Sequence, residues 1–127
     1  MLGPLRHGGD AMKRGDVFLA DLHPRSGSEQ RGRRPVIVVS RDSFNMAAGW
    51  QSVIVVPCST SPNQRRRGPT VALLPAGLGG LESDSVALCH QITTLDRSKL
   101  MVHLGTLSPA EMTDIEQGIL AAVDLDG

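Results

Sequence analysis

Nine residues rich in glycine and arginine, Gly27-Ser28-Glu29-Gln30-Arg31-Gly32-Arg33-Arg34-Pro35, lead directly into the apolar run Val36-Ile37-Val38-Val39-Ser40. A β-branched run of this length is too short for a helix and predicts a buried strand. The loop before it presents backbone N–H groups and guanidinium forks at the rigid start of that strand. Such an arrangement suits the binding of an anion such as phosphate.

Further strands are predicted on both sides of this run. Residues 16–21 form the strand before it, and residues 52–56, 70–74 and 85–89 form the strands after it. Residues 41–51 are expected to be a loop with some helical character, and a helical turn is expected around residues 97–100. The basic segment at residues 65–69 is predicted to be a turn.

The end of the chain predicts one amphipathic helix. Ser108, Pro109 and Glu111 supply an N-cap, a proline at the first helical position and a capping-box glutamate. An apolar stripe follows at spacings of three and four residues: Met112, Ile115, Ile119, Ala122 and Val123. The sequence therefore predicts an α+β protein that is mainly β, a small SH3-like β-barrel of about five antiparallel strands closed by this helix.

The bulk composition indicates one folded domain. The chain has 127 residues, of which 40% are hydrophobic, so it can bury a single core, predicted for residues 12–127. Residues 1–11 are predicted to be a disordered extension. The net charge of +0 hides an asymmetry, since residues 1–70 hold eleven basic and five acidic side chains while residues 71–127 hold two and eight. A basic half suits a polyanionic partner.

Two cysteines, Cys58 and Cys89, lie in or beside apolar runs and outside any Cys-x-x-Cys spacing. Buried free thiols in a cytosolic protein are the favoured interpretation. The sequence contains neither a signal peptide nor a long apolar segment, which predicts a cytoplasmic location and no membrane contact.

Three ordered motifs show a family resemblance: residues 13–17 (Lys-Arg-Gly-Asp-Val), the loop 27–35 with its Arg-Pro-Val element, and residues 53–60 (Val-Ile-Val-Val-Pro-Cys-Ser-Thr). The chain resembles the MazF/PemK family of toxin endoribonucleases from about residue 12 to residue 125. The resemblance implies a CcdB/MazF-like fold, a homodimer and a cognate MazE-like antitoxin. It also implies sequence-specific, metal-independent cleavage of single-stranded RNA, with mRNA as the favoured substrate. This cleavage leaves 2′,3′-cyclic phosphate and 5′-hydroxyl ends, and it inhibits translation and growth.

The chemistry is expected to rest on side chains, without a cofactor, because the sequence has no His/Asp/Glu cluster at metal-ligand spacing. Arg34 is the first candidate, since Pro35 fixes the backbone after it and its guanidinium can fork two phosphate oxygens. We expect it to stabilise charge and to donate a proton, because deprotonating a guanidinium is costly. The general base stays open between Glu29, which matches the Ser-Glu-Gln loop of the family, and His23.

Ser59 stands where relatives commonly place a threonine, and its hydroxyl can donate to a phosphate oxygen or orient the 2′-OH. One alternative is that the neighbouring Thr60 takes this role. The other is that this segment has no catalytic role and only forms the turn that ends the strand. The other residues expected to contact RNA are Arg25, Ser28, Gln30, Arg31, Arg33, Arg65, Arg66, Arg67 and Gln91, together with Thr60. Base selection is expected from loops 25–31, 45–50 and 91–94, with Trp50 either stacking a base or belonging to the core.

Three further matches to the family, at residues 84–85, 91–92 and 95–97, are expected to be structural and dimer-facing, and His90 and His103 are expected to be structural. Two other functions remain open. A gyrase-targeting toxin shares the fold but performs no hydrolysis, and a nuclease weakened by the serine at position 59 would only bind RNA.

Overall fold

The computed structural model describes residues 12–23, 27 and 32–125, and for residues 65–67 it describes the backbone alone. The predicted extension, residues 1–11, lies outside the described residues. The elements in chain order are β1 (Asp16–Asp21), β2 (Arg33–Val38), α1 (Asp42–Asn45), β3 (Ser52–Ser59), η1 (Pro62–Thr70), β4 (Val71–Leu74), η2 (Leu78–Gly80), β5 (Ser85–Leu88), η3 (Cys89–Gln91), β6 (Thr93–Asp96), η4 (Arg97–Lys99), β7 (Leu100–Thr106) and α2 (Pro109–Ala122).

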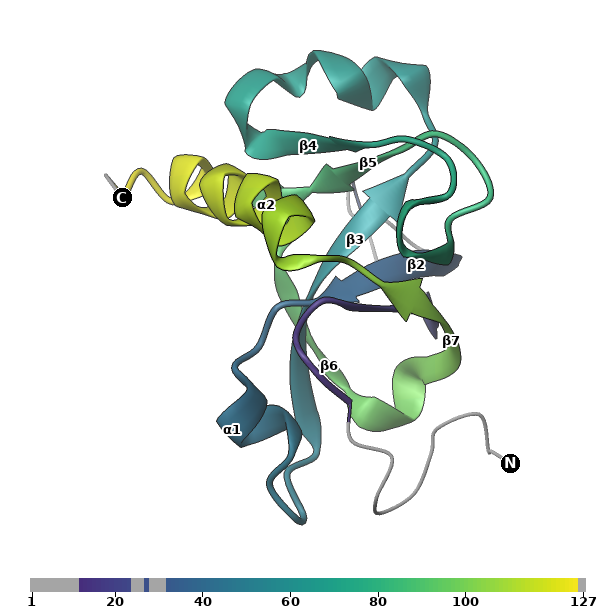
Figure 1. Cartoon of the computed structure of the whole chain (residues 1–127), viewed down its shortest axis with the longest axis vertical. Coiled ribbons are helices and arrows are strands. Elements are labelled where there is room, and N and C mark those ends of the chain that lie inside the picture. Colours follow the sequence, from purple (N-terminus) through teal and green to yellow (C-terminus); the bar gives the residue numbers. More distant parts are fainter. Residues whose placement is uncertain (1–11, 24–26, 28–31, 126–127) are drawn as a thin grey trace.

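An antiparallel sheet of seven strands forms the body of the molecule (Figure 1). The strands follow the order β4-β5-β3-β2-β1-β7, and β6 pairs with β3 off this path. β3 is central because its residues pair in turn with β6 over 52–55, with β2 over 55–57 and with β5 at 58–59. The long strand β3 thereby connects the two ends of the fold.

Successive side chains of β1, β2 and β3 alternate between two apolar cores. One core contains Val17, Ile37, Val56, Cys58 and the α2 residues Met112 and Ile115. The other contains Phe18, Val36, Val38, Val53, Val55, Leu95 and Leu100. Because both faces of these strands are buried, their apolar runs are continuous rather than alternating.

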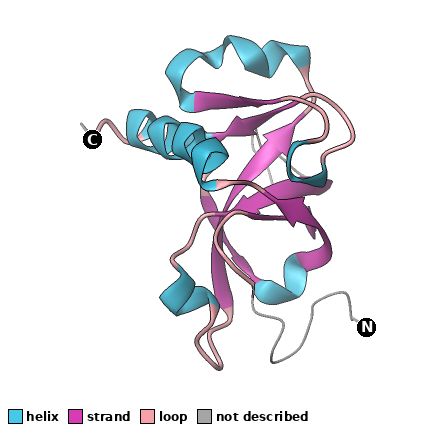
Figure 2. Cartoon of the chain, in the orientation of Figure 1, coloured by secondary structure: helices cyan, strands magenta, loops and turns pink. Residues whose placement is uncertain are grey.

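The C-terminal helix α2 has the predicted cap. The Ser108 hydroxyl accepts the Glu111 backbone N–H at 3.1 Å, and the Glu111 carboxylate accepts the Ser108 N–H at 2.8 Å. α2 packs against η1, η3 and β4, and Figure 2 shows it beside the upper strands, with its C-terminal end extending to the left. The local sequence signal therefore fixes the start of this helix, while its apolar stripe fixes the face that it buries.

The α+β class, the mainly β content and the terminal helix are confirmed. The sheet differs from the predicted barrel of about five strands, because it has seven strands and, within the described residues, its pairing runs as an open path from β4 to β7. β6 and β7 were not predicted, and β3 continues three residues beyond the predicted 52–56 because Cys58 and Ser59 pair with β5. The segment 65–69 lies in the helix η1 rather than in a turn.

Two predicted strand ends also differ, because β2 ends at Val38 rather than at Ser40 and β5 ends at Leu88, with Cys89 in η3. Other local expectations agree with the structure. Helix α1 lies within the expected loop 41–51, and η4 forms the expected helical turn. Cys58 and Cys89 are both buried and free. In the described part of the chain, no helix is long and apolar enough to cross a membrane.

Candidate active site

The start of β2 exposes the two arginines that the sequence singles out. Arg33 and Arg34 are exposed at the first two positions of the strand, Pro35 is partly buried, and the strand is fully buried from Val36 onward. Gly32 turns the chain into the strand with φ 78°, and its carbonyl accepts the Leu22 N–H at 2.9 Å. The two guanidinium groups therefore extend from a rigid end of the sheet.

The pairing of β2 with β3 relates Arg34 to Ser59. Val36 pairs with Pro57 and Ile37 with Val56. The β2–β3 pairing ends at Val36–Pro57, and Arg34 and Ser59 each lie two residues beyond this last pair, near the start of β2 and at the end of β3. Because side chains alternate along a strand, both then lie on the sheet face of Val36, and Arg33 lies on the other face.

Ser59 is almost completely buried, with 6% of its surface exposed. Its hydroxyl oxygen accepts the Ser61 backbone N–H at 3.0 Å, so Ser59 stabilises the turn that ends β3. The hydroxyl hydrogen remains a possible donor, since a serine hydroxyl both accepts and donates. Thr60, the neighbouring candidate, is exposed.

His23 and Asp21 lie beside Arg33 at the end of β1. Asp21 pairs with Arg33 across the strands, and a Cβ on Gly32 would lie 3.6 Å from His23 Cε1. The Asp21 carboxylate accepts the His23 backbone N–H at 3.0 Å and lies 3.2 Å from its Nδ1. The backbone hydrogen bond from His23 is the main reason why the pKa of Asp21 lies below its usual value. Sequence reasoning named His23 but missed Asp21, although an acid two residues before the histidine was a usable signal.

Several predicted residues cannot be placed at this end of the sheet. Arg25, Ser28, Glu29, Gln30 and Arg31 lie outside the described residues, and Arg65, Arg66 and Arg67 belong to η1 without described side chains. Gln91 is partly buried in η3, which packs against α2, β3 and β4. The structure therefore places Arg33, Arg34, Ser59, Thr60 and His23 at the neighbouring ends of β1, β2 and β3.

Comparison with known protein families identifies the family of this chain. Residues 13–123 match the model of the PemK-like, MazF-like toxins of type II toxin–antitoxin systems. The chain belongs to this family. It is 37% identical over 108 residues to Endoribonuclease MazF of Staphylococcus saprophyticus, and the match covers 85% of this chain and 88% of that protein. The protein is thus a MazF-like toxin endoribonuclease of a toxin–antitoxin system.

Solved structures agree with this membership. An endoribonuclease from a mycobacterial species, in complex with its cognate antitoxin, has a TM-score of 0.73 and 26% identity, covering 92% of this chain and 99% of that chain. MazF from Deinococcus radiodurans has the same fold, with a TM-score of 0.73, 23% identity and coverage of 91% and 98%. The seven-stranded sheet with its terminal helix is accordingly a MazF fold.

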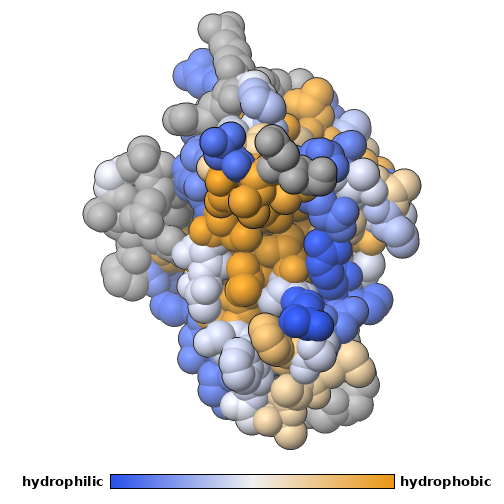
Figure 3. Space-filling view, turned by 90° about the vertical axis from the view of Figure 1, so that its left-hand side faces the viewer, coloured by the Kyte–Doolittle hydropathy of each residue, from blue (hydrophilic) through white to orange (hydrophobic). Residues whose placement is uncertain are grey.

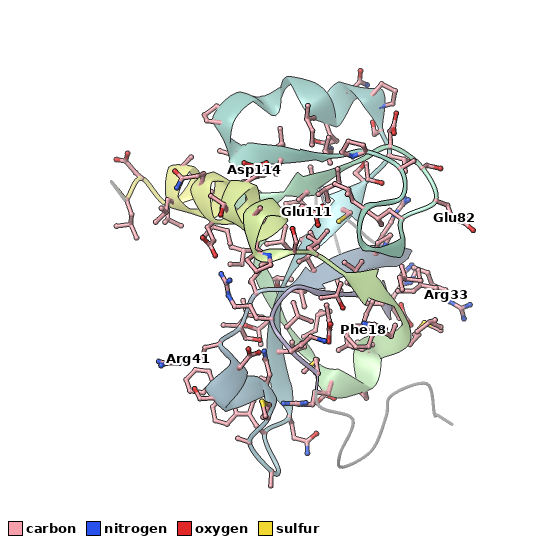
Figure 4. The ribbon with its side chains drawn as sticks, in the orientation of Figure 1. Phe18, Arg33, Arg41, Glu82, Glu111 and Asp114 are labelled. Carbon is pink, nitrogen blue, oxygen red and sulfur yellow. The ribbon has the colours of Figure 1, made fainter. Side chains whose placement is uncertain are left out.

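Trp50, a sequence candidate for base stacking, lies away from the start of β2 in this MazF-family toxin. Trp50 is a surface residue, 44% exposed, and stacks on Phe44 with ring centroids 5.1 Å apart. This stack lies in the α1–β3 loop beside Arg41, and Figure 4 shows Arg41 and Arg33 at opposite edges of the molecule. His103 packs edge-on against Phe18, with its Nε2 3.4 Å from the buried Asp16 carboxylate, as expected for a structural histidine.

The described residues contain no group of three or more His, Cys, Asp or Glu side chains that could hold a metal ion. The buried thiols are poor nucleophiles. Burial raises the pKa of Cys58 to about 12, with a further contribution from Cys89, and burial raises the pKa of Cys89 to about 11. Both thiols therefore stay protonated at neutral pH, and the polar groups at the start of β2 are the better candidates for chemistry.

Proposed function

We propose that this MazF-family endoribonuclease cleaves single-stranded RNA at a short sequence and without a metal ion, and that its main substrate is mRNA. The 2′-oxygen of one nucleotide attacks the adjacent phosphorus, the bond from phosphorus to the 5′-oxygen breaks, and the products are a 2′,3′-cyclic phosphate and a 5′-hydroxyl. The β2–β3 pairing supports this proposal most directly, because an exposed guanidinium and a hydroxyl each lie two residues beyond its last pair, on the same sheet face.

Arg34 stabilises the charge that develops on the phosphate oxygens, since its fork can bind two of them at once. Its N–H group also donates toward the departing 5′-oxygen. The Ser59 hydroxyl donates to one of the same non-bridging phosphate oxygens, while its own oxygen accepts the Ser61 N–H. If Ser59 stays locked in its turn, the exposed Thr60 hydroxyl takes this role.

A general base must remove the 2′-OH proton. His23 and Glu29 are the two candidates, and only His23 is described by the structure, with Asp21 Oδ1 3.2 Å from its Nδ1. A carboxylate at this distance orients the ring and stabilises the imidazolium that forms when the other ring nitrogen takes the proton. Glu29 competes through its place in the family's Ser-Glu-Gln loop.

The remaining basic and polar candidates bind the RNA backbone. Arg33 is exposed on the sheet face opposite Arg34, so the two side chains contact different phosphates. The further contacts are assigned to Arg25, Ser28, Gln30, Arg31, Arg65, Arg66, Arg67 and Gln91. Binding that depends on these arginines weakens as the salt concentration rises.

Two protein partners are part of the proposal. The first is a MazE-like antitoxin in the cytoplasm, by analogy with the mycobacterial relative that was solved with its antitoxin. The second is another copy of this chain. A groove of about 330 Å³ runs between α2 and the sheet, with the apolar residues Val39, Ile54, Ile92, Ile119 and Leu120 in its wall and the Arg14–Glu116 ion pair beside them.

Figure 3 shows apolar side chains gathered on this face, near the C-terminal end of α2. Val123 and Leu125 continue the surface, 51% and 60% exposed. We assign this face to the homodimer interface. Light scattering on a sizing column tests the assignment: Leu120→Glu is expected to give monomers, whereas Leu73→Glu, at an exposed site on β4, is expected to leave the dimer intact.

Cleavage is tested with a long unstructured RNA in excess EDTA, with the 5′ ends of the fragments mapped. We expect cuts at one short motif by the unmutated protein, loss of at least about a hundredfold in rate for Arg34→Ala, and little change for the matched control Arg41→Ala. Equal cutting by Arg34→Ala contradicts the mechanism. RNA binding without cutting would favour an inactive RNA-binding protein, and Ser59→Thr would be the next variant to test. Inhibition of gyrase supercoiling, with neither RNA binding nor RNA cutting, would favour the gyrase-targeting toxin.

A further inference from the structure

A cavity of about 400 Å³ opens between the loop before β5 and the strands β1, β2 and β7. Leu19, Pro35, Leu81 and Leu104 form its apolar wall, and Thr60 and Glu82 contribute polar groups. Glu82 is exposed, and Figure 4 shows it projecting from the same edge of the molecule as Arg33. The volume lies within the range of about 300 to 1,000 Å³ that is typical of small-ligand pockets.

The loop that forms one wall of this cavity is held rigidly. A Cβ on Gly80 would overlap the Leu104 carbonyl, and one on Gly105 would lie 2.6 Å from the Gly79 carbonyl carbon, so the loop and β7 are in backbone contact. The Asp84 carboxylate accepts the Ala76 N–H at 2.8 Å. The cavity is therefore preformed, which lowers the ordering cost of binding a ligand.

The position of the cavity relates it to the proposed active site. Pro35 directly follows Arg34, and Thr60 directly follows Ser59. Because side chains alternate along β2, Pro35 shares its sheet face with Arg33 and not with Arg34. An RNA strand that passes around the start of β2 thus meets Arg34 on one face and Arg33 with the cavity on the other.

We propose that this cavity binds one unpaired nucleobase of the RNA, from a nucleotide flanking the cleaved bond, and that Glu82 selects a base with an exocyclic amino group. The apolar walls accept the flat ring, as unstacked bases require in single-stranded RNA recognition. A carboxylate accepts a hydrogen bond from the amino group of cytosine, adenine or guanine. Uracil has no such group, and its single N3–H donor lies between two carbonyl oxygens that a carboxylate disfavours.

This inference rests on the proposed RNA cleavage, and its test separates the two. A random RNA pool is cut by the unmutated protein, by Glu82→Gln and by the control Asp114→Asn, whose side chain is exposed on α2 (Figure 4). The three amino-bearing bases outnumber uracil about threefold in an even pool, and we expect their ratio to uracil at one flanking position of the cut RNA to exceed this value. Glu82→Gln, whose amide can also donate to uracil, should lower that ratio by about fivefold or more, a comparison within one pool that does not depend on the total amount of cleavage. Asp114→Asn should leave the ratio unchanged.

A binding experiment gives the same readout without cleavage. The Arg34→Ala protein, with and without Glu82→Gln, is mixed with the random pool, and the bound RNA is sequenced. If the bound RNA shows a base preference and Glu82→Gln removes it, the base pocket is supported even when none of the proteins cuts RNA. The absence of cutting would contradict the proposed function alone. An unchanged preference in both experiments, or no preference in the unmutated protein, overturns the inference.

Discussion

The two halves of β2 lie in one six-residue strand but have opposite environments. Arg33 and Arg34 are exposed at its start, whereas Val36, Ile37 and Val38 are each 0% exposed. Ile37 packs with the α2 residues Met112 and Ile115, while Val36 and Val38 pack with Phe18 on the other face. The buried half is thus enclosed by two cores and the exposed half by none.

This difference separates stability from chemistry within a few residues. The buried half anchors the strand, so the exposed half can present charged groups from a fixed backbone. Substitutions in the buried half should therefore reduce the free energy of unfolding, and substitutions in the exposed half should reduce activity.

Ile37→Ala is expected to have the largest effect, a loss of about 3 kcal/mol in the free energy of unfolding, because it opens a cavity in the core beneath α2. Chemical denaturation measures the change. Val102→Ala is the matched control, since Val102 is 46% exposed on β7 and should cost less than about 0.5 kcal/mol. A loss below about 1 kcal/mol for Ile37→Ala would show that the buried half is not the anchor.

Arg97→Ala should cost about 2 kcal/mol, because it leaves backbone carbonyls without a donor in the loop that follows the buried end of β2. The Arg97 guanidinium donates to the carbonyls of Phe44, Asn45 and Trp50. Faster amide exchange in residues 41–51 is the specific measurement. Lys99→Ala, which removes one bond to the His23 carbonyl, is the control and should leave this loop unchanged.

Local signals predicted the parts of the fold that depend on neighbouring residues. The Ser108–Glu111 capping box fixes the start of α2, and the run from Val36 identifies β2 as a buried strand. β7 could not be predicted in this way. Its His103 and Gly105 interrupt a strand pattern, and they are explained only by contacts with Phe18 and Gly79, which are distant in sequence.

The candidate site shows the same limit. Arg34 and Ser59 were found from their motifs, but their common face follows from the register of β2 with β3, which pairs residues about 20 positions apart. The cavity beside Pro35 was missed because its wall comes from the loop before β5 and depends on the contact between Gly80 and Leu104. Trp50 lies on the surface, where it stacks on Phe44, a contact that the sequence pattern did not predict.

The two buried thiols make stability depend on pH. The folded pKa values of Cys58 and Cys89, about 12 and about 11, lie above the ordinary value of 9.0. Folding therefore favours the protonated thiols, and their contribution is complete below about pH 9 and is lost as the pH rises toward 11 or 12. We expect a loss on the order of 1 kcal/mol per thiol between pH 9 and pH 10.

Unfolding at pH 8 and pH 10 measures this loss, and the Cys58→Ala protein should show a smaller difference between the two values than the unmutated protein. In the folded state neither thiol should react with a disulfide reagent at pH 8. Rapid reaction of Cys58 under native conditions would mean that this part of β3, next to Ser59, opens to solvent.

Arg34→Ala should have the smallest effect on stability, less than about 0.5 kcal/mol in the free energy of unfolding, because the side chain is exposed at the strand start. The same variant should lose RNA cleavage, so it is the counterpart of Ile37→Ala, which should keep its cleavage rate at temperatures where it remains folded. Measuring both properties on both proteins separates the two halves of β2. If Arg34→Ala loses several kcal/mol, the lost cleavage would reflect unfolding, and the guanidinium would be a structural group that fastens the start of β2 rather than one that acts on phosphate.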